Sequence, residues 1–289
     1  MDDFADLVGP YRPELLLHCY RLLGSRTDAE DALQETLLAA WRGIDGFEGR
    51  SSLRTWLYKI ATNRCLNFRR RVPPAPAPSF TPPPSSRSGD VPWLQPFPDD
   101  LLPDAAYEMR ETVGLAFITS LQRMPPRQAA TLILRDVLDY STAEVAAMLG
   151  ETPTVVKGLL QRARASRAPA PAAPPPGSPE EVALVDRFAE AFSVRDMPAL
   201  LSLLTDDAWL SMPPAPHEYH GHQAIAAFLR SSPTWRPDLS LRLTPTRVNT
   251  QPAYACRLDD APAGLLVLTL HGDRIAAMTR FLPDSETAG

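Results

Sequence analysis

Hydrophobic positions follow a helical period in residues 27–71 and 127–167 and change to an alternating period towards the C-terminus. This change predicts helices in the first part of the chain and a sheet in the last part. Thr27 to Glu30 has the sequence of a capping box, in which two side chains satisfy free N–H groups at a helix start. The helix that follows is expected to turn five apolar residues inward: Leu33, Leu37, Ala40, Trp41 and Ile44.

A second helix is expected to start at Ser51 or Ser52. Its inward side is expected to carry Trp56, Leu57, Ile60, Ala61 and Arg64. We interpret Trp56 as a core anchor rather than a platform on which a base stacks. Tyr58 and the basic side chains are left for the surface of the helix.

Residues 125–167 predict a helix-turn-helix. A first helix over 127–138 would bury Ala130, Leu132, Ile133, Leu134 and Val137. Ser141 to Glu144 forms a second capping box, Gly150 ends the short helix that follows, and Thr152 with Pro153 begins the last helix. That helix would bury Val155 or Val156, Leu159 or Leu160, and Ala163.

The outward face of this last helix is polar at its start and basic further on, with Thr154, Lys157, Gln161, Arg162, Arg164 and Arg167. Short polar side chains suit base edges and basic ones suit phosphates, as in a recognition helix. A generic helical hairpin with a solvated basic face is the alternative. Gly158 lies inside the helix, where glycine either permits a close approach of DNA or only weakens the helix.

The C-terminal part predicts an α+β domain. Ser178 to Glu181 is a third capping box, and Asp196 caps a second helix. A strand over 208–212 and a helix over 223–230 follow. Alternating residues near 239–243, the segment AYACRL and a hairpin over 264–282 predict further strands. We expect a curved antiparallel sheet that wraps around a pocket.

Proline divides the chain. Residues 72–103 hold 11 prolines, which predicts an extended and mostly disordered linker, and a stiffer Pro/Ala spacer follows after residue 167. The predicted organisation is two all-α domains and one α+β domain: 1–71, linker 72–103, 104–167, linker 168–177, and 178–289.

Charge is distributed unevenly over these parts. Residues 179–289 hold nine Arg against 14 Asp or Glu, which equals the net charge of −5 of the whole chain. Residues 50–71 hold seven Lys or Arg, no acidic residue and three aromatic residues. Such a basic run indicates a nucleic-acid contact, because phosphates are a line of negative charge.

Other classes of protein are disfavoured. The three cysteines are far apart and form no CxxC pair, which argues against a disulfide framework or a zinc site and favours a reducing cytoplasm. The N-terminus has no apolar signal-peptide region, and no apolar run reaches about 18 residues. We therefore expect a cytoplasmic protein without a membrane span and without a cofactor.

Two long segments carry a resemblance to a known family. RTDAEDALQETLLAAWRGIDGFEGRSSLRTWLYKIATNRCLNFRRR resembles region 2 of bacterial sigma factors of the extracytoplasmic-function class, and LQRMPPRQAATLILRDVLDYSTAEVAAMLGETPTVVKGLLQRARA resembles region 4. The segment PWLQPFPDDLL and the C-terminal part are similar to the SigG-like subgroup, which carries a SnoaL-like domain after region 4.

The resemblance implies partners and site residues. Core RNA polymerase would bind the acidic helix over 28–42 through Asp28, Asp31, Gln34 and Glu35, although a solvated helix face is the other interpretation of this pattern. The linker would run towards the RNA exit channel. The helix that begins at Thr152 would enter the major groove of the −35 element of promoter DNA. Its contact residues would be Thr152, Thr154, Lys157, Gln161, Arg162 and Arg164.

The −10 element would bind a larger set, with the loop Phe47–Ser52 as the candidate for receiving a flipped base. The set is Phe47, Arg50, Ser51, Ser52, Arg54, Tyr58, Lys59, Asn63, Arg64, Arg69, Arg70 and Arg71. A sigma factor is not an enzyme, and no catalytic residue is expected.

The C-terminal part leaves alternatives open. His217, His220 and His222, with Glu218 between them, could chelate a metal, and Asp206 or Asp207 could serve an acid–base enzyme of the cyclase or isomerase type. A ligand-binding domain of a helix-turn-helix regulator, with a small molecule in the pocket, is another alternative. The family resemblance favours a regulatory role for this part of the chain. Its net charge of −5 suggests that it docks on the basic DNA-binding surfaces.

Overall fold

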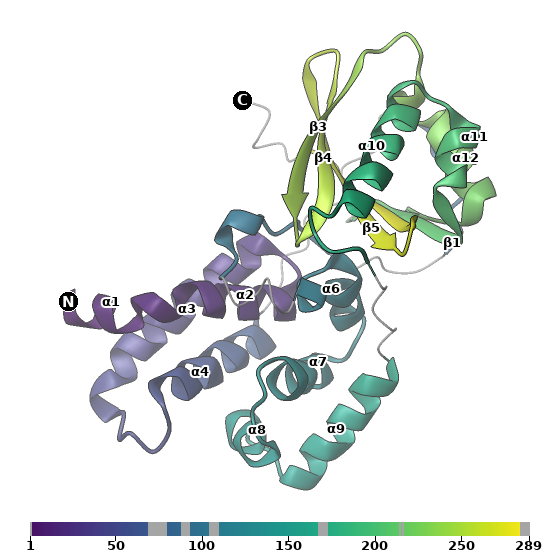
Figure 1. The fold of residues 1–289 in the computed structure, drawn as a ribbon. Helices are drawn as coiled ribbons and strands as arrows, with labels where there is room; N and C mark the ends of the chain where they lie inside the picture. Colours follow the sequence, from purple (N-terminus) through teal and green to yellow (C-terminus); the bar gives the residue numbers. More distant parts are fainter. Residues whose placement is uncertain are drawn as a thin grey trace. The chain divides into compact units, whose positions relative to one another are not determined.

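The computed structural model describes residues 2–68, 80–87, 93–103, 110–166, 173–213, 215 and 217–283. The chain forms two compact units (Figure 1). The first unit comprises Met1–Val72 and Trp93–Pro169, and the second comprises Pro73–Pro92 and Ala170–Gly289. Arg69, Arg70, Arg71 and Arg167, all predicted to be basic surface residues, lie outside the described residues. Within the described part of the chain, no helix is long and apolar enough to cross a membrane.

The first unit is all-α. Its helices are α1 (Asp2–Val8), α2 (Arg12–Leu23), α3 (Arg26–Gly43), α4 (Leu53–Asn67), α6 (Leu115–Gln122), α7 (Pro126–Leu132), α8 (Thr142–Leu149) and α9 (Pro153–Ser166). Helices α2, α3 and α4 pack against one another, and α7, α8 and α9 form the helix-turn-helix. A π-helical turn, Ile133–Val137, continues α7, and its wide turn is closed by the N–H of Leu138, which donates to the carbonyl of Ile133 (3.0 Å).

The start of α3 differs from the prediction. Ser25, not Thr27, is the N-cap, and its hydroxyl accepts from the N–H of Asp28 (3.1 Å). The N–H of Thr27 donates instead to Oε1 of Gln95, which also accepts from the Ser25 hydroxyl (both 3.0 Å). A side chain from the predicted linker thus completes the helix start, which local sequence could not reveal.

The inward faces of α3 and α4 are rotated from those predicted. In α3, Leu33 and Ala40 are buried as expected, but Trp41 is 50% exposed. In α4 the buried stripe is Leu57, Tyr58, Ala61, Thr62 and Cys65, whereas Trp56 is half-buried and Arg64 is exposed. The prediction followed apolar residues alone, but a buried tyrosine and threonine lie on the true inward side because their hydroxyls find partners there.

The helix-turn-helix follows the prediction closely. Ser141 and Glu144 form the full capping box, and Gly150 ends α8 in the left-handed conformation (φ +65°). The Thr152 hydroxyl accepts from the N–H of Val155 (3.3 Å), which caps α9. Of the paired alternatives, Val156 is buried together with Ala163, and Val155 is 41% exposed.

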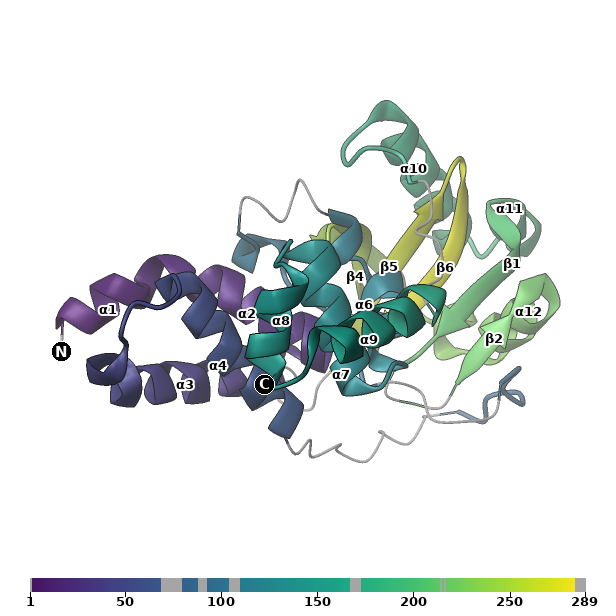
Figure 2. The ribbon, with the colours of Figure 1, turned by 90° about the horizontal axis from the view of Figure 1, so that it is seen from below.

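The second unit is α+β. Its helices are α10 (Pro179–Ser193), α11 (Met197–Ser202) and α12 (Gly221–Ser231), and its strands are β1 (Leu204–Ser211), β2 (Glu218–His220), β3 (Leu241–Val248), β4 (Gln251–Leu258), β5 (Ala261–His271) and β6 (Arg274–Phe281). The strand order is β2-β1-β6-β5-β4-β3, and Figure 2 shows β4, β5, β6 and β1 side by side. Because β1 runs parallel to β6, the sheet is mixed and the expectation of an antiparallel sheet was wrong.

The core of the second unit lies between the helices and one face of the sheet. It combines residues of α10 and α12, such as Phe188 and Phe228, with strand residues such as Tyr254 and Met278. Gly264 stands at a register shift between β4 and β5. A Cβ atom there would lie 2.0 Å from the carbonyl oxygen of Phe281, and its φ is +93°, so only glycine fits this position.

Candidate polymerase and nucleic-acid interface

The acidic face of α3 borders an open hollow of about 840 Å³. All four residues predicted to bind polymerase line it, together with residues of α3 and of the end of α4: Asp28, Asp31, Gln34, Glu35, Leu38, Arg64, Asn67 and Phe68. Leu38 is 47% exposed at this site. Exposed apolar side chains beside charged ones are typical of a protein interface. The apolar pattern had placed Trp41 in the core, although it is 50% exposed, and it did not single out Leu38.

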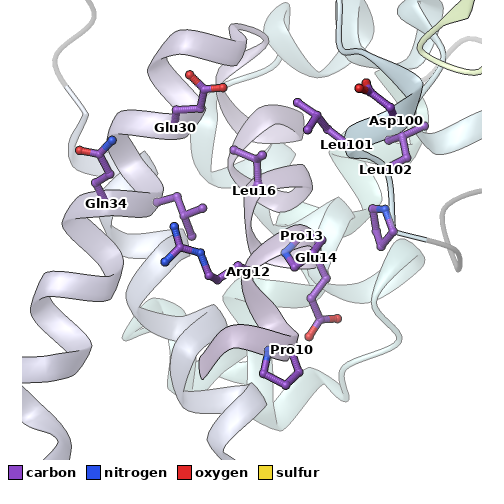
Figure 3. A pocket seen from close by; sticks show the side chains of 12 residues that line it. Pro10, Arg12, Pro13, Glu14, Leu16, Glu30, Gln34, Asp100, Leu101 and Leu102 are labelled. Carbon is purple, nitrogen blue, oxygen red and sulfur yellow. The ribbon is translucent and has the colours of Figure 1, made fainter. Parts of the chain in front are cut away.

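A second hollow of about 700 Å³ lies on the other side of α3 (Figure 3). Glu30 and Gln34 of α3 face it from one side, and residues of α2 such as Leu16 line its floor. Leu101 and Leu102, from the end of the predicted linker, close the opposite side. Gln34 therefore borders both hollows, and the linker contributes to a surface that sequence analysis assigned to α3 alone.

The linker segment around Gln95 is held by the first unit. The Tyr20 hydroxyl donates to the carbonyl of Gln95 (2.9 Å), and the N–H of Gln95 donates to the carbonyl of Gly24 (2.9 Å). Phe97 is completely buried against Tyr20, with ring centroids 4.7 Å apart. Prolines prevent a helix here, but they leave the segment extended enough to pack.

Residues predicted for the −10 element gather around α4. Trp56, Lys59, Asn63 and Arg64 line a smaller hollow of about 330 Å³ between α3 and α4. The ring of Phe47 packs at a tilt of 38° against that of Trp56, with centroids 5.1 Å apart. This aromatic pair joins the loop before α4 to the hollow. Trp56 thus borders the basic surface, and our interpretation of it as a core anchor was incomplete.

The other residues of the loop before α4 are exposed. Ser52 caps α4 by accepting from the N–H of Thr55 (3.0 Å), and Ser51 lies beside it. Arg50 is 85% exposed and pairs with Glu48 at 3.2 Å, which leaves its guanidinium accessible.

Tyr58 is not a surface residue. Its side chain is 1% exposed, and its hydroxyl donates to Oε2 of Glu14 (3.1 Å). Burial and the negative charge of Glu14 hold the pKa of Tyr58 above its usual value. The prediction of Tyr58 as a DNA contact is therefore wrong for this structure, because the ring packs between α2 and the helix-turn-helix beside His18 and Tyr140.

Arg54 is held by the same carboxylate. Its guanidinium makes a two-pronged contact with Glu14 (3.0 and 2.7 Å) and lies 4.8 Å from the centre of the Tyr58 ring. The hydrogen bonds to Glu14 raise the pKa of Arg54 further above its usual value. Arg54 is charged but paired, so it joins α4 to α2 and offers little free charge to DNA.

Two buried groups join the helices of the first unit. Arg21 donates to the carbonyl and the hydroxyl of Thr112 (3.1 and 2.6 Å), and burial lowers its pKa to about 10. His18 is completely buried with Nε2 2.9 Å from the hydroxyl of Thr62. Burial, aided by Arg21 and Arg54, lowers the pKa of His18 to about 3, so the imidazole is neutral.

The recognition helix presents its predicted residues to solvent. Thr152, Thr154, Lys157, Gln161, Arg162 and Arg164 are all exposed. Arg164 makes two hydrogen bonds to Asp136 of the π-helical turn (2.9 and 2.7 Å), which raise its pKa. Among the described residues, Lys157 and Arg162 form no ion pair, so they are the more available cations of α9.

The candidate chemistry of the second unit is dispersed. The Asp206 side chain is 96% exposed, and its nearest cation, Arg274, lies 4.0 Å away. The His220 ring packs on Trp209 (4.5 Å), and His222 bonds the carbonyl of Thr205 (3.0 Å). Among the described residues, no three His, Cys, Asp or Glu side chains gather as metal ligands would.

Family comparisons fit this arrangement of helices and sheet. Models described as Sigma-70 region 2, Sigma-70 region 4 and SnoaL-like domain match residues 7–72, 114–166 and 185–258. The ECF RNA polymerase sigma factor SigG of Mycobacterium tuberculosis is 42% identical, over 97% of this chain and 81% of the relative. The chain belongs to the ECF RNA polymerase sigma factors.

Other relatives agree with this assignment of the ECF sigma factor. SigW of Bacillus subtilis is 29% identical, over 56% of this chain and 86% of its own length. The crystal structure of the sigma factor SigJ of Mycobacterium tuberculosis has the same fold, with a TM-score of 0.64, 22% identity and 97% coverage of both chains. Sigma factors are not enzymes in the catalytic sense, and the alternative of an ordinary helix-turn-helix regulator does not account for region 2.

Proposed function

We propose that this ECF sigma factor binds core RNA polymerase through α3 and promoter DNA through α4 and α9. The observation that supports the proposal is that α3 and α4 border two hollows of different character. The first is lined by the acidic and polar residues Asp28, Asp31, Gln34 and Glu35. The second is lined by Lys59, Asn63 and Arg64. Opposite charges next to each other suit two partners of opposite charge: a basic protein surface for the carboxylates and DNA for the cations.

For the −10 element, the aromatic pair Phe47–Trp56 is the part best suited to a base. A base that leaves the duplex stacks on an aromatic ring, and this is worth about 1–3 kcal/mol per base. Arg50, three residues after Phe47, and Lys59, which lines the hollow with Trp56, are exposed and suit the phosphates. For the −35 element, Thr152 and Thr154 at the start of α9 would approach base edges, and Lys157 and Arg162 would hold the backbone.

The test is runoff transcription with purified core polymerase, followed by mapping of start sites. The full chain should confer start sites that core polymerase alone lacks. Asp31→Arg with Glu35→Arg should weaken core binding at least about tenfold, because like charges then meet across the interface. Glu190→Arg, the same change on exposed α10, is the control and should bind as the wild type does. A chain that neither binds core polymerase nor directs initiation overturns the proposal.

The second unit is proposed to modulate this activity. It carries the net negative charge of the chain, and a short tether after residue 167 would hold it at high local concentration, in the millimolar range for short linkers. Docking on the basic surfaces would then weaken promoter binding. Truncation after Arg167 should raise promoter-dependent transcription, most at low salt. Unchanged activity at every salt concentration would rule this docking out.

A further inference from the structure

Part of the linker between regions 2 and 4 belongs to the second unit. We call Phe80–Arg87 the linker strap. The N–H of Ser86 donates to the carbonyl of Glu218 (2.8 Å), and the N–H groups of Glu218 and His220 donate to the hydroxyls of Ser85 and Ser86 (both 3.0 Å). These bonds join the strap to a strand more than 130 residues further along the chain.

The strand that receives the strap is at the edge of the sheet. β2 is the outermost strand next to β1, so one side of β2 has no strand partner. An open edge presents unpaired N–H and carbonyl groups, and a peptide can bind by adding to it. The strap covers this edge through one main-chain bond, from Ser86 to Glu218, and through the hydroxyls of Ser85 and Ser86, which accept from main-chain N–H groups of β2.

Aromatic packing fixes the other end of the strap. Phe80 packs against the core of the second unit, with its ring 5.8 Å from that of Phe228. Phe228 in turn stacks on Tyr219 at 4.6 Å. Tyr219 is fully buried, and its hydroxyl donates to the carbonyl of Pro83 (3.0 Å). A buried hydroxyl that donates to the strap would lose its partner if the strap left.

A charge contact closes the strap at its C-terminal end. Nε of Arg87 lies 4.0 Å from the carboxylate of Glu218, whose side chain is only 8% exposed. Hydrogen bonds to the main chain of β2, an aromatic contact and an opposite charge therefore act along the eight residues. This combination is characteristic of a bound peptide rather than of a passing linker.

We infer that the SnoaL-like domain is a receptor for the linker strap, and that release of the strap lengthens the tether between regions 2 and 4. The inference rests on the proposed function, because a sigma factor must reach two promoter elements at once. Eight extended residues span up to about 28 Å. A docked strap is fixed to the second unit, so these residues no longer belong to the freely moving part of the tether. Binding and release of the strap would therefore control how far the two DNA-binding regions can separate.

Limited trypsin digestion of the full chain tests the docking, because Arg87 is itself a cleavage site. Cleavage after Arg87 requires the strap to leave β2 and enter the protease. Phe80→Ala and Tyr219→Phe should each speed this cleavage. Loss of one or two net interactions of about 0.5–1.5 kcal/mol corresponds to roughly 2- to 100-fold. Thr81→Ala is the matched control, since Thr81 is exposed. Equal cleavage rates in all four proteins would overturn the docking.

Runoff transcription of the same four proteins tests the consequence. Phe80→Ala and Tyr219→Phe should change the amount of transcript relative to Thr81→Ala and wild type. If digestion reveals docking and all four transcribe equally, the control of tether length is refuted. Failure of the proposed function would give a different result. In that case none of the four proteins would bind core polymerase or direct transcription, regardless of how fast trypsin cleaves after Arg87.

Discussion

The side-chain amide of Asn63 on α4 donates to the main-chain carbonyl of Met148 on α8, with 3.1 Å between nitrogen and oxygen. The same amide donates to the carbonyl of Lys59 (2.7 Å). A residue proposed for the −10 backbone is thus bonded to the helix-turn-helix proposed for the −35 element. Promoter binding through Asn63 therefore requires that α4 and α8 separate.

The Asn63→Ala variant should loosen this contact. Loss of the bond should lower the stability of the α4–α8 packing by about 0.5–1.5 kcal/mol. Hydrogen exchange of α8 peptides, read by mass spectrometry, measures the effect. Asn67→Ala is the matched control, because Asn67 lies one turn further on α4 and bonds only the carbonyl of Asn63. Equal exchange in the two variants would mean that the Asn63–Met148 bond does not hold the helices together.

The Lys157→Ala variant should reduce the salt dependence of promoter binding. Each phosphate that a cation neutralises contributes about 0.9 to the slope of log affinity against log salt concentration for duplex DNA. We expect the slope to fall by about that amount, and by a similar amount on unrelated duplexes, because a phosphate contact carries no sequence information. Fluorescence anisotropy at several salt concentrations gives the slope. Arg187→Ala on α10 removes the same charge elsewhere, and a slope lowered equally by both variants would contradict the assignment.

The Gly158→Ala variant should stabilise the recognition helix. A Cβ at this position would lie 3.5 Å from Nη1 of Arg162, an ordinary contact, so the methyl group fits. Alanine is favoured over glycine within a helix by about 0.5–1 kcal/mol. Slower hydrogen exchange in α9 is the expected result, and faster exchange would contradict it. If promoter affinity falls while the helix gains stability, the glycine serves a close approach to DNA.

Acid should destabilise the first unit through His18. The Thr62 hydroxyl donates to the carbonyl of Tyr58, so it accepts from Nε2–H of a neutral His18. The pKa of His18 is about 3 in the folded chain and 6.5 in the unfolded chain. Between these values the unfolded chain binds a proton that the folded chain does not. This linkage lowers the unfolding free energy by up to about 1.4 kcal/mol for each pH unit below 6.5.

His18→Gln keeps a donor towards Thr62 but cannot take up a proton. Its unfolding free energy should therefore fall less than that of the wild type between pH 7 and pH 4. Urea-dependent hydrogen exchange of α2 and α4 peptides isolates the first unit from the second. Parallel acid profiles of the two proteins would show that His18 does not carry the effect.

Local signals in the sequence predicted much of the helix-turn-helix. The capping box at Ser141, the left-handed Gly150 and the cap at Thr152 act within a few residues, so the chain reveals them directly. The exposed side of α9 followed from the same spacing. The hairpin of β5 and β6 was also visible, because its turn contains Gly272 with a φ of +58°.

Long-range contacts account for what the sequence did not reveal. Glu14 is 40 residues from Arg54, and its carboxylate turned a predicted DNA contact into a helix-to-helix pair. Gln95 displaced the expected cap of α3, and the parallel pairing of β1 with β6 joins strands far apart in the chain. The periodic pattern assigned Trp41 to the interior, but its side chain is 50% exposed. Each of these required the folded chain.

The π-helical turn Ile133–Val137 makes the helix-turn-helix sensitive to the exact number of residues at this point. A wide turn holds one residue more than a regular helix would, and here it buries Ile133, Leu134 and Val137 while directing Asp136 to Arg164. Deleting a single residue would close the wide turn into a regular one and change which of these side chains face the core and which face α9. Loss of one residue from this turn should therefore disturb both its buried side chains and the Asp136–Arg164 contact.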